Sequence, residues 1–130
     1  MIELIEGLPD GVIGIEAVGD VTLEDYDNFV APVVERALAS HQKIRLLHVF
    51  GDRFTGHSAS ALLEDAKLGL SNLRSIERIA VVTDIRRFRA LVKGAGWTFP
   101  GDLKLFSNAE RAVAEAWVSE GLQPTTRPLI

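Results

Sequence analysis

The stretch that most constrains the fold is Ile76–Asp84 (IERIAVVTD), a short apolar run that ends at a polar residue able to start a helix. A run of this kind is typical of a buried parallel strand that leads into a helix. The same succession of strand and helix recurs, with further strands predicted at Lys43–Phe50 and Leu103–Phe106. Because connections between such strands are short and right-handed, we expect these three strands to run parallel, with the Ile76 strand between the other two.

Two strands and one helix are predicted in the amino-terminal part of the chain. The strands cover Met1–Glu6 and Val12–Val18, and the turn residues Leu8-Pro-Asp-Gly11 between them indicate a hairpin-like pair. Thr22 then caps a helix in which apolar residues recur every three or four positions. Pro32 lies within that pattern, so we expect a kink or a delayed start in the first half of the helix.

Turn and cap residues divide the middle of the chain. The segment Gly51–Gly56 contains two glycines and an aspartate and predicts a loop, which leads into a helix from about Ser58 to Leu73. Asp84 follows the Ile76 strand and is expected to cap a further helix that ends near Lys93.

A final helix is predicted from Ser107 or Asn108 to Glu120. Val113 and Trp117 lie one turn apart in this segment, so both should occupy its inner face.

The predicted order of elements is β-β-α-β-α-β-α-β-α, a single α/β domain over residues 1–121 followed by a flexible tail over residues 122–130. Right-handed crossovers place the helices mainly on one face of a mixed, mostly parallel sheet. Three charged residues fall inside predicted strands, which favours a partly hydrated opposite face: Glu16, Arg45 and Lys104.

Composition narrows the classes of function. A chain of 130 residues with 47% hydrophobic residues suits one globular domain. The absence of cysteine excludes disulfides and thiolate metal sites, and a net charge of −4 argues against a nucleic-acid partner. The first residues do not resemble a signal peptide, and no run approaches the roughly 20 apolar residues of a membrane span. We therefore expect a cytoplasmic protein.

The sequence Gly56-His57-Ser58-Ala59-Ser60 comes one residue away from the G-x-S-x-G nucleophile elbow of α/β hydrolases. In those enzymes the catalytic histidine follows the serine, whereas His57 is the last histidine of this chain. The base is missing, so Ser58 is interpreted as a helix cap, and no catalytic residue is predicted.

No metal or cofactor is predicted either. His41, His48 and His57 show no spacing typical of metal ligands. Gly94-Ala-Gly96 neither follows a strand nor opens a helix, so it does not present amides to a phosphate. Asp84 stands at the carboxyl end of a strand, where open sheets bind ligands, but its role as a helix cap already accounts for it.

Five segments carry a resemblance to a known family: Phe54–Ser58, Leu62–Lys67, Ile76–Asp84, Leu103–Phe106 and Ala112–Val118. Together they resemble the SpoIIAA-like family of bacterial proteins, over roughly Ile2 to Gly121. That family is similar in fold to STAS domains and is grouped with Sec14-type lipid-binding proteins. The resemblance implies a mixed sheet, no catalytic residues, and binding of proteins, membranes or nonpolar small molecules.

We expect a non-enzymatic domain that binds a nonpolar small molecule or a peripheral membrane surface, in a cleft between the helices that begin at Ser58 and Asp84. Trp97 and Phe99 lie in a loop flanked by glycines, where they would serve either as a lid or membrane contact or as core side chains. The candidate contact residues are Phe54, His57, Leu68, Trp97 and Phe99.

The alternative is a STAS-type regulatory module that binds another protein, and a homodimer is compatible with either function. Anti-sigma-factor antagonists carry an Asp-Ser-Ser-Gly phosphorylation motif where this chain has Gly56-His57-Ser58-Ala59. The motif is degraded, but Ser58 remains a candidate phosphorylation site, because a helix N-terminus tolerates the added negative charge.

Overall fold

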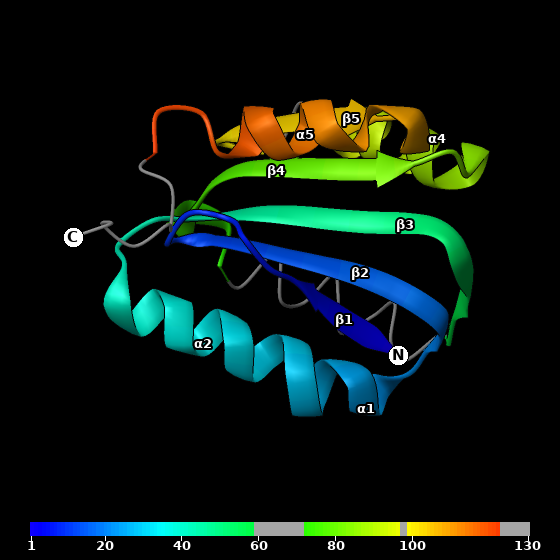
Figure 1. The fold of residues 1–130 in the computed structure, drawn as a ribbon, viewed down its shortest axis with the longest axis horizontal. Coiled ribbons are helices and arrows are strands. Elements are labelled where there is room, and N and C mark those ends of the chain that lie inside the picture. Colours follow the sequence, from blue (N-terminus) through cyan, green and yellow to red (C-terminus); the bar gives the residue numbers. More distant parts are fainter. Residues whose placement is uncertain (59–71, 97–98, 123–130) are drawn as a thin grey trace.

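The computed structural model describes residues 1–58, 72–96 and 99–122. Within these residues five strands form one sheet in the order β1-β2-β3-β4-β5 (Figure 1). β1 pairs antiparallel with β2, and the other neighbouring strands pair in parallel. The strands are β1 (Ile2–Ile5), β2 (Val12–Val21), β3 (Ile44–His57), β4 (Ile76–Thr83) and β5 (Asp102–Phe106). The predicted mixed sheet is confirmed, with the Ile76 strand between its two expected neighbours.

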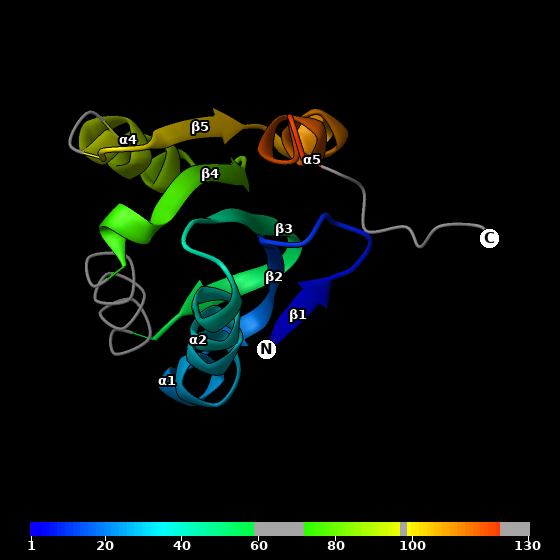
Figure 2. The same ribbon diagram turned by 90° about the vertical axis from the view of Figure 1, so that its left-hand side faces the viewer.

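Helices lie on both faces of this sheet (Figure 2). The described helices are α1 (Leu23–Asp25), the π-helical turn η1 (Tyr26–Val30), α2 (Ala31–Ser40), the 3₁₀ turn η2 (Leu73–Ser75), α4 (Arg86–Ala95), the 3₁₀ turn η4 (Asn108–Glu110) and α5 (Arg111–Val118). α2 and α4 pack on one face and α5 on the other, which confirms helices mainly on one face. α5 is free to take the opposite face because it follows the last strand of the sheet and connects no pair of parallel strands.

Alternation of side chains along the strands produces two apolar cores. In β3, Phe50 belongs to the core beneath α2 and α4, whereas Leu47 and Val49 belong to the core beneath α5. In β4, Val81 and Val82 divide in the same way. Burial on both faces explains why β4 is an almost continuous apolar run.

The three charged strand residues share the face on which α5 lies. Glu16 and Arg45 are each only 8% exposed, while Lys104 is exposed. Arg45 donates from Nη1 to carbonyl oxygens at and just beyond the end of α5, those of Val118 (3.0 Å) and Glu120 (2.7 Å). The polar face exists as predicted, but two of its three charges are buried and paired.

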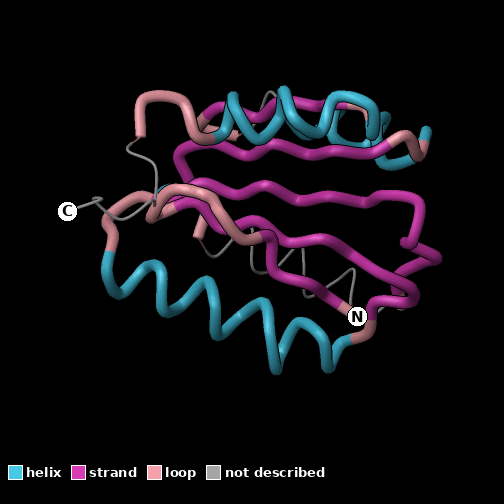
Figure 3. Tube along the Cα trace, viewed as in Figure 1, coloured by secondary structure: helices cyan, strands magenta, loops and turns pink. Residues whose placement is uncertain are grey.

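The loop predicted at Gly51–Gly56 is wrong, because β3 continues as a strand to His57 (Figure 3). β2 also extends beyond its predicted end, to Val21, and provides the hydrogen-bonding partner. Gly19 of β2 pairs with Phe54, and Val21 pairs with His57. The register shifts around Gly19, an irregularity of the kind that bends and twists a strand. Glycine and aspartate favour a loop, but here the backbone hydrogen bonds to β2 keep this segment in the sheet.

The predicted helix start is confirmed, but near Pro32 the structure has a π-helical turn in place of the expected kink or delayed start. The Thr22 hydroxyl accepts the N–H of Asp25 (3.4 Å), and the Asp25 carboxylate accepts the N–H of Thr22 (2.8 Å), which is a capping box. The irregularity near Pro32 is the π-helical turn η1, in which the Ala31 N–H donates to the carbonyl of Tyr26. Proline has no N–H to donate, so an altered hydrogen-bonding register just before it is accommodated.

Asp84 does not cap α4, contrary to the prediction. Its Oδ1 accepts the backbone N–H of Asn108 at 3.0 Å and so holds the start of η4. α4 begins after Ile85, whose N–H donates to the Thr83 hydroxyl, and no side chain caps this helix. The error arose because the capping partner is 24 residues away in the chain.

Ser107, one of the two predicted caps, starts the final helical segment and forms a capping box with Glu110. Val113 is 57% exposed, so its predicted inner position is wrong, and the buried residues of α5 are Ala114 and Val118. Trp117 is partly buried against the same core. The 3₁₀ turn η4 has fewer residues per turn than an α-helix and therefore rotates the faces of α5 away from those expected of a continuous helix.

Candidate ligand-binding site

Four ring side chains form an aromatic cluster on the face covered by α2 and α4: Phe50, Phe54 and His57 from β3, and Phe88 from α4. The ring centroid of Phe50 lies 5.1 Å from that of Phe54 and 5.0 Å from that of Phe88. His57 lies 5.1 Å from Phe54 and 5.8 Å from Phe88. These are favourable edge and tilted contacts. The unpredicted extension of β3 creates the cluster, because it carries Phe54 and His57 back beside Phe50.

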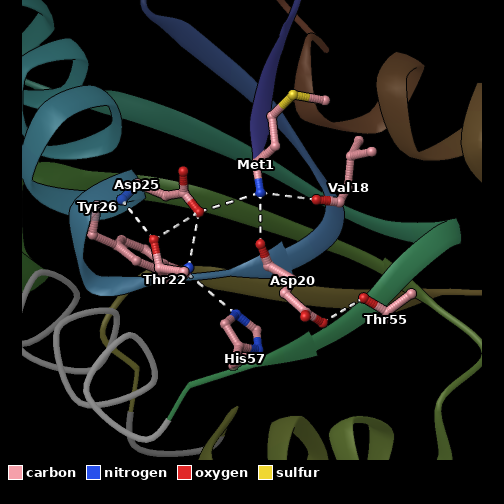
Figure 4. A network of polar contacts seen from close by, with 8 residues as sticks. All are labelled: Met1, Val18, Asp20, Thr22, Asp25, Tyr26, Thr55 and His57. Atoms are coloured by element: carbon pink, nitrogen blue, oxygen red, sulfur yellow. Dashed lines mark hydrogen bonds and ion pairs between the residues drawn. The ribbon is translucent and has the colours of Figure 1, made fainter.

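Tyr26 contacts the aromatic cluster from the helical side (Figure 4). Its hydroxyl lies 3.5 Å from Nε2 of His57, and the side chain is 2% exposed. Tyr26 directly follows Asp25, so the capping box at Thr22 fixes the point at which this ring enters the core.

Asp25 lies at the centre of the polar network around the helix start (Figure 4). Burial raises the pKa of its carboxyl, but hydrogen bonds from Thr22 and from the Met1 amino group, together with the charge of that group, outweigh burial and lower the pKa overall. The Met1 nitrogen also donates to the carbonyls of Val18 and Asp20. The ionised carboxylate thereby links β1, β2 and the first helical turn.

Two adjacent cavities lie on this face and share His48 and Val81. The cavity against α4 measures ≈ 120 Å³, and its further described lining residues are Phe50, His57, Phe88, Leu91 and Val92. The neighbouring cavity measures ≈ 220 Å³ and extends toward α2, with aliphatic lining apart from His48 and Asn72. Walls that are mainly apolar, with few polar groups, are typical of sites for nonpolar ligands.

The two histidines are the polar groups of the cavity wall against α4. The ring of His48 stacks on Phe50 at a centroid distance of 4.2 Å, and His57 faces Tyr26. A neutral imidazole offers one donor and one acceptor, and Nε2 of His57 already lies 3.5 Å from the Tyr26 hydroxyl.

The structure brings together two of the predicted contact residues, Phe54 and His57. Phe99 is partly buried and packs against the core beneath α2 and α4. Leu68 and Trp97 lie outside the described residues. Contact of any of these residues with a ligand stays a prediction.

Ser58 is exposed, and its N–H donates to the carbonyl of Val21 at 3.0 Å, which continues the pairing of β2 with β3. The helix predicted to start there lies outside the described residues, so α4 is the described wall of the predicted cleft. The roles of Ser58 as a helix cap and as a phosphorylation site both stay predictions.

Sequence reasoning did not identify Tyr26, His48, Phe50 or Phe88 as site residues, because each fits an apolar core pattern. One signal was available. Parallel strands place their carboxyl ends, and the helices that follow them, at one edge of a sheet. Ring side chains near the ends of two such strands therefore converge, and Phe50 and Phe88 satisfy that condition.

The outer side of α4 carries positive charge beside an exposed leucine. Arg86, Arg87 and Lys93 are exposed, and Leu91 is 64% exposed. Arg89 instead donates to backbone carbonyls at the ends of β4 and β5. Basic and apolar side chains on one exposed helix are typical of contact with an anionic lipid surface.

Within residues 1–58, 72–96 and 99–122, no group of three or more histidine, aspartate or glutamate side chains is arranged to hold a metal ion. None of the helices in those segments is both long and apolar enough to cross a membrane.

Comparisons with known proteins agree with this architecture. The model of the SpoIIAA-like family matches residues 12–119, and the chain belongs to that family. Among solved structures, the chain is similar to the crystal structure of an uncharacterized protein of the DUF3478 family with a SpoIIAA-like fold from Shewanella loihica PV-4. The TM-score is 0.72 at 28% sequence identity, covering 91% of this chain and 92% of the other. No curated protein matches this sequence at a significant level.

Proposed function

We propose that this SpoIIAA-like domain is a non-enzymatic binding protein whose ligand is a nonpolar small molecule held against β3, β4 and α4. The observation that carries the proposal is the cavity beside α4, which is walled by Phe50, Phe88 and aliphatic side chains and contains two histidines. Apolar surface removed from water contributes about 25 cal/mol per Å². A ligand in the two adjacent cavities gains its affinity from that burial, and its polar end lies beside His48 and His57.

A peripheral membrane surface is the second candidate partner, favoured by the outer side of α4. Lys and Arg residues near an anionic leaflet each contribute about 1 kcal/mol to association. Arg86, Arg87 and Lys93 would supply this attraction, and Leu91 would enter the interface. Leu91 also lines the cavity, so membrane contact would place the cavity beside lipid.

The STAS-type regulatory alternative rests on Ser58, whose side chain is exposed directly after His57 of the aromatic cluster. A phosphate on Ser58 would add about two negative charges beside the cavity. Such a modification would change either ligand affinity or the docking of a protein partner.

Titration with a dansyl-labelled fatty acid tests the ligand site. We expect saturable binding with a blue shift of the dansyl emission, and displacement by unlabelled palmitate. Val92→Phe adds bulk inside the cavity and should weaken binding about tenfold or more. Val113→Phe makes the same change on the exposed side of α5 and should bind like the wild type. Absence of saturable binding, or equal affinity in both variants, would refute the proposal.

Sedimentation with vesicles tests the membrane candidate separately. The wild type should sediment with vesicles of phosphatidylglycerol and phosphatidylcholine. The double variant Arg87→Glu/Leu91→Ser should stay in the supernatant. Equal sedimentation with pure phosphatidylcholine vesicles would contradict the role of the basic helix.

A further inference from the structure

A cavity of ≈ 270 Å³ lies on the α5 face, against β2, β3 and β4 and beside the start of α5. It is separated by the sheet from the cavities described above. Two valines and Gly51 contribute to its lining, and its other described lining residues are Glu16, Asp52, Arg53, Asn108 and Arg111. The volume falls just below the roughly 300–1,000 Å³ typical of ligand sites, so an occupant is small.

Glu16 is the buried acid of this cavity. It projects from the middle of β2 and is 8% exposed, a position that requires compensation for the lost hydration of a carboxylate. Arg111 Nη1 donates to its Oε1 at 3.1 Å, and Arg53 Nη2 lies 3.2 Å from the same oxygen. Its Oε2 faces Gly51, where an added Cβ would stand 3.3 Å away. Both ion pairs therefore end on one oxygen, and the absence of a side chain at Gly51 leaves space beside the other.

The two arginines differ in how fully they are engaged. Arg53 also binds Glu3, at 2.8 Å, and this hydrogen bond together with the charge of Glu16 raises the pKa of the guanidinium. Arg111 has a weaker second partner, Glu115, at 3.8 Å from Nε. Arg111 is therefore the better placed of the two to bind an incoming anion.

Asn108 of η4 also lines this cavity. Its backbone N–H donates to Asp84, but its side-chain Oδ1 is buried and accepts no hydrogen bond from any described residue. Because this oxygen is enclosed, it offers no acceptor to an occupant of the cavity, and Asn108 serves only as part of the wall.

We propose that this cavity binds a free amino acid. The described lining carries two carboxylates and two guanidinium groups, which matches a zwitterion of zero net charge. The ligand carboxylate accepts from Arg111, and the ammonium group donates to Oε2 of Glu16. A purely structural ion pair would not need the space beside Gly51.

Nuclear magnetic resonance titration of the ¹⁵N-labelled protein with each of the standard proteinogenic amino acids tests this site. At least one amino acid should produce saturable shifts at the amides of Gly51, Asn108 and Arg111. Propionate and ethylamine each retain one charged group of alanine, and each should bind more weakly than the amino acid that binds best. Arg111→Gln should weaken binding about tenfold or more, because it removes a hydrogen bond to a charged group. Arg36→Gln removes one arginine from the opposite face and should bind like the wild type.

Gly51→Ala keeps every charge and places a methyl group beside Oε2 of Glu16. This variant tests the amino acid site even if Arg111→Gln fails to fold. The affinity of Gly51→Ala for the amino acid should also be lower than that of the wild type. No saturable shift with any amino acid would overturn the proposal, as would unchanged affinity in the variants, or shifts confined to α4 and the aromatic cluster. The dansyl fatty acid titration reports on the other face, so failure of one site is distinguishable from failure of the other.

Discussion

The two faces of the sheet use the same strands to build cavities of opposite chemistry. On the face of α2 and α4, β3 contributes His48 and Phe50 to an aromatic and aliphatic wall. On the face of α5, the same strand contributes Val49 and Gly51 to a cavity lined by charged groups. Successive residues of a strand point to opposite faces, so the two chemistries are interleaved along one stretch of sequence.

The two cavities depend on the fold in different ways. Three members of the aromatic cluster, Phe50, Phe54 and His57, come from β3 alone. The polar cavity joins residues far apart in the chain, with Glu16 and Arg111 separated by 95 positions. A slip of one residue in β2 would turn Glu16 to the other face and leave both arginines without it. The polar cavity therefore depends more strongly on the correct register of β2 than the aromatic cluster does.

Loss of Phe50 should have the largest effect, because this ring touches every other member of the aromatic cluster. We expect Phe50→Ala to lower the free energy of unfolding by about 3–5 kcal/mol, the usual cost of deleting a buried aromatic side chain. Urea denaturation measures the change. Val113→Ala, on the exposed side of α5, should stay within about 0.5 kcal/mol of the wild type. A loss below about 1 kcal/mol at Phe50 would show that the cluster does not organise its face.

Removing the charge of Glu16 should have a smaller effect on stability. Glu16→Gln leaves Arg53 and Arg111 facing a neutral amide, but both arginines are partly exposed and keep Glu3 and Glu115 as partners. We expect a loss of about 1–2 kcal/mol in urea denaturation. Glu115→Gln removes a carboxylate of the same network at the surface and should change stability by at most about 0.5 kcal/mol. Equal losses in the two variants would mean that burial of Glu16 has no energetic consequence.

The sequence predicted the sheet well and its edges poorly. Apolar runs are local signals, so β4 was predicted with its observed bounds, and the pairing of β3, β4 and β5 followed from connection rules. The extension of β3 depends on what β2 does next to it, and the partner of Asp84 is Asn108 on another element. Neither the pairing of β2 with the end of β3 nor the hydrogen bond between Asp84 and Asn108 produces a periodic pattern in the sequence.

The site residues divide in the same way. Phe54 and His57 were named as candidate contact residues, although Phe54 stood in a segment predicted to be a loop and His57 directly after it. Glu16 was recognised as a charged strand residue on the partly hydrated face. Its partners were not predicted, because Arg53 stood in the supposed loop and Arg111 in a helix whose facing was predicted wrongly. Long-range ion pairs follow from register and helix rotation, which only the structure provides.

The two capping boxes offer a test of how separately the faces behave. Thr22 starts the helix that carries Tyr26 to the aromatic cluster, and Ser107 starts the helix that carries Arg111 to the polar cavity. Replacing either residue with alanine should cost about 1 kcal/mol. Thr22→Ala should shift the amide resonances of Tyr26 and His57, and Ser107→Ala those of residues beside the polar cavity. If both variants perturb the same resonances, the two faces are coupled through the sheet.

The smallest expected effect is the pH dependence contributed by the cap at Ser107. Glu110 accepts the backbone N–H of Ser107 at 2.9 Å and its hydroxyl at 3.1 Å. Both hydrogen bonds lower the pKa of the Glu110 carboxyl in the folded state, and the hydrogen bond from the backbone N–H contributes the larger share. A lowered pKa in the folded state means that the contribution to stability is fully present above the ordinary carboxyl pKa and is lost as the pH falls through the lower, folded value.

Glu110→Gln should therefore lose less stability than the wild type on acidification, while the two proteins differ most at neutral pH. Urea denaturation from neutral pH to about pH 3 measures this difference, since an unperturbed glutamate titrates near 4.3. Asp25 occupies the matching position in the Thr22 capping box, and its pKa is also lowered, although burial opposes the shift. Asp25→Asn should show the same sign of effect from the other face. A stability difference between Glu110→Gln and the wild type that grows as the pH falls would contradict the lowered pKa and remove the electrostatic account of this cap.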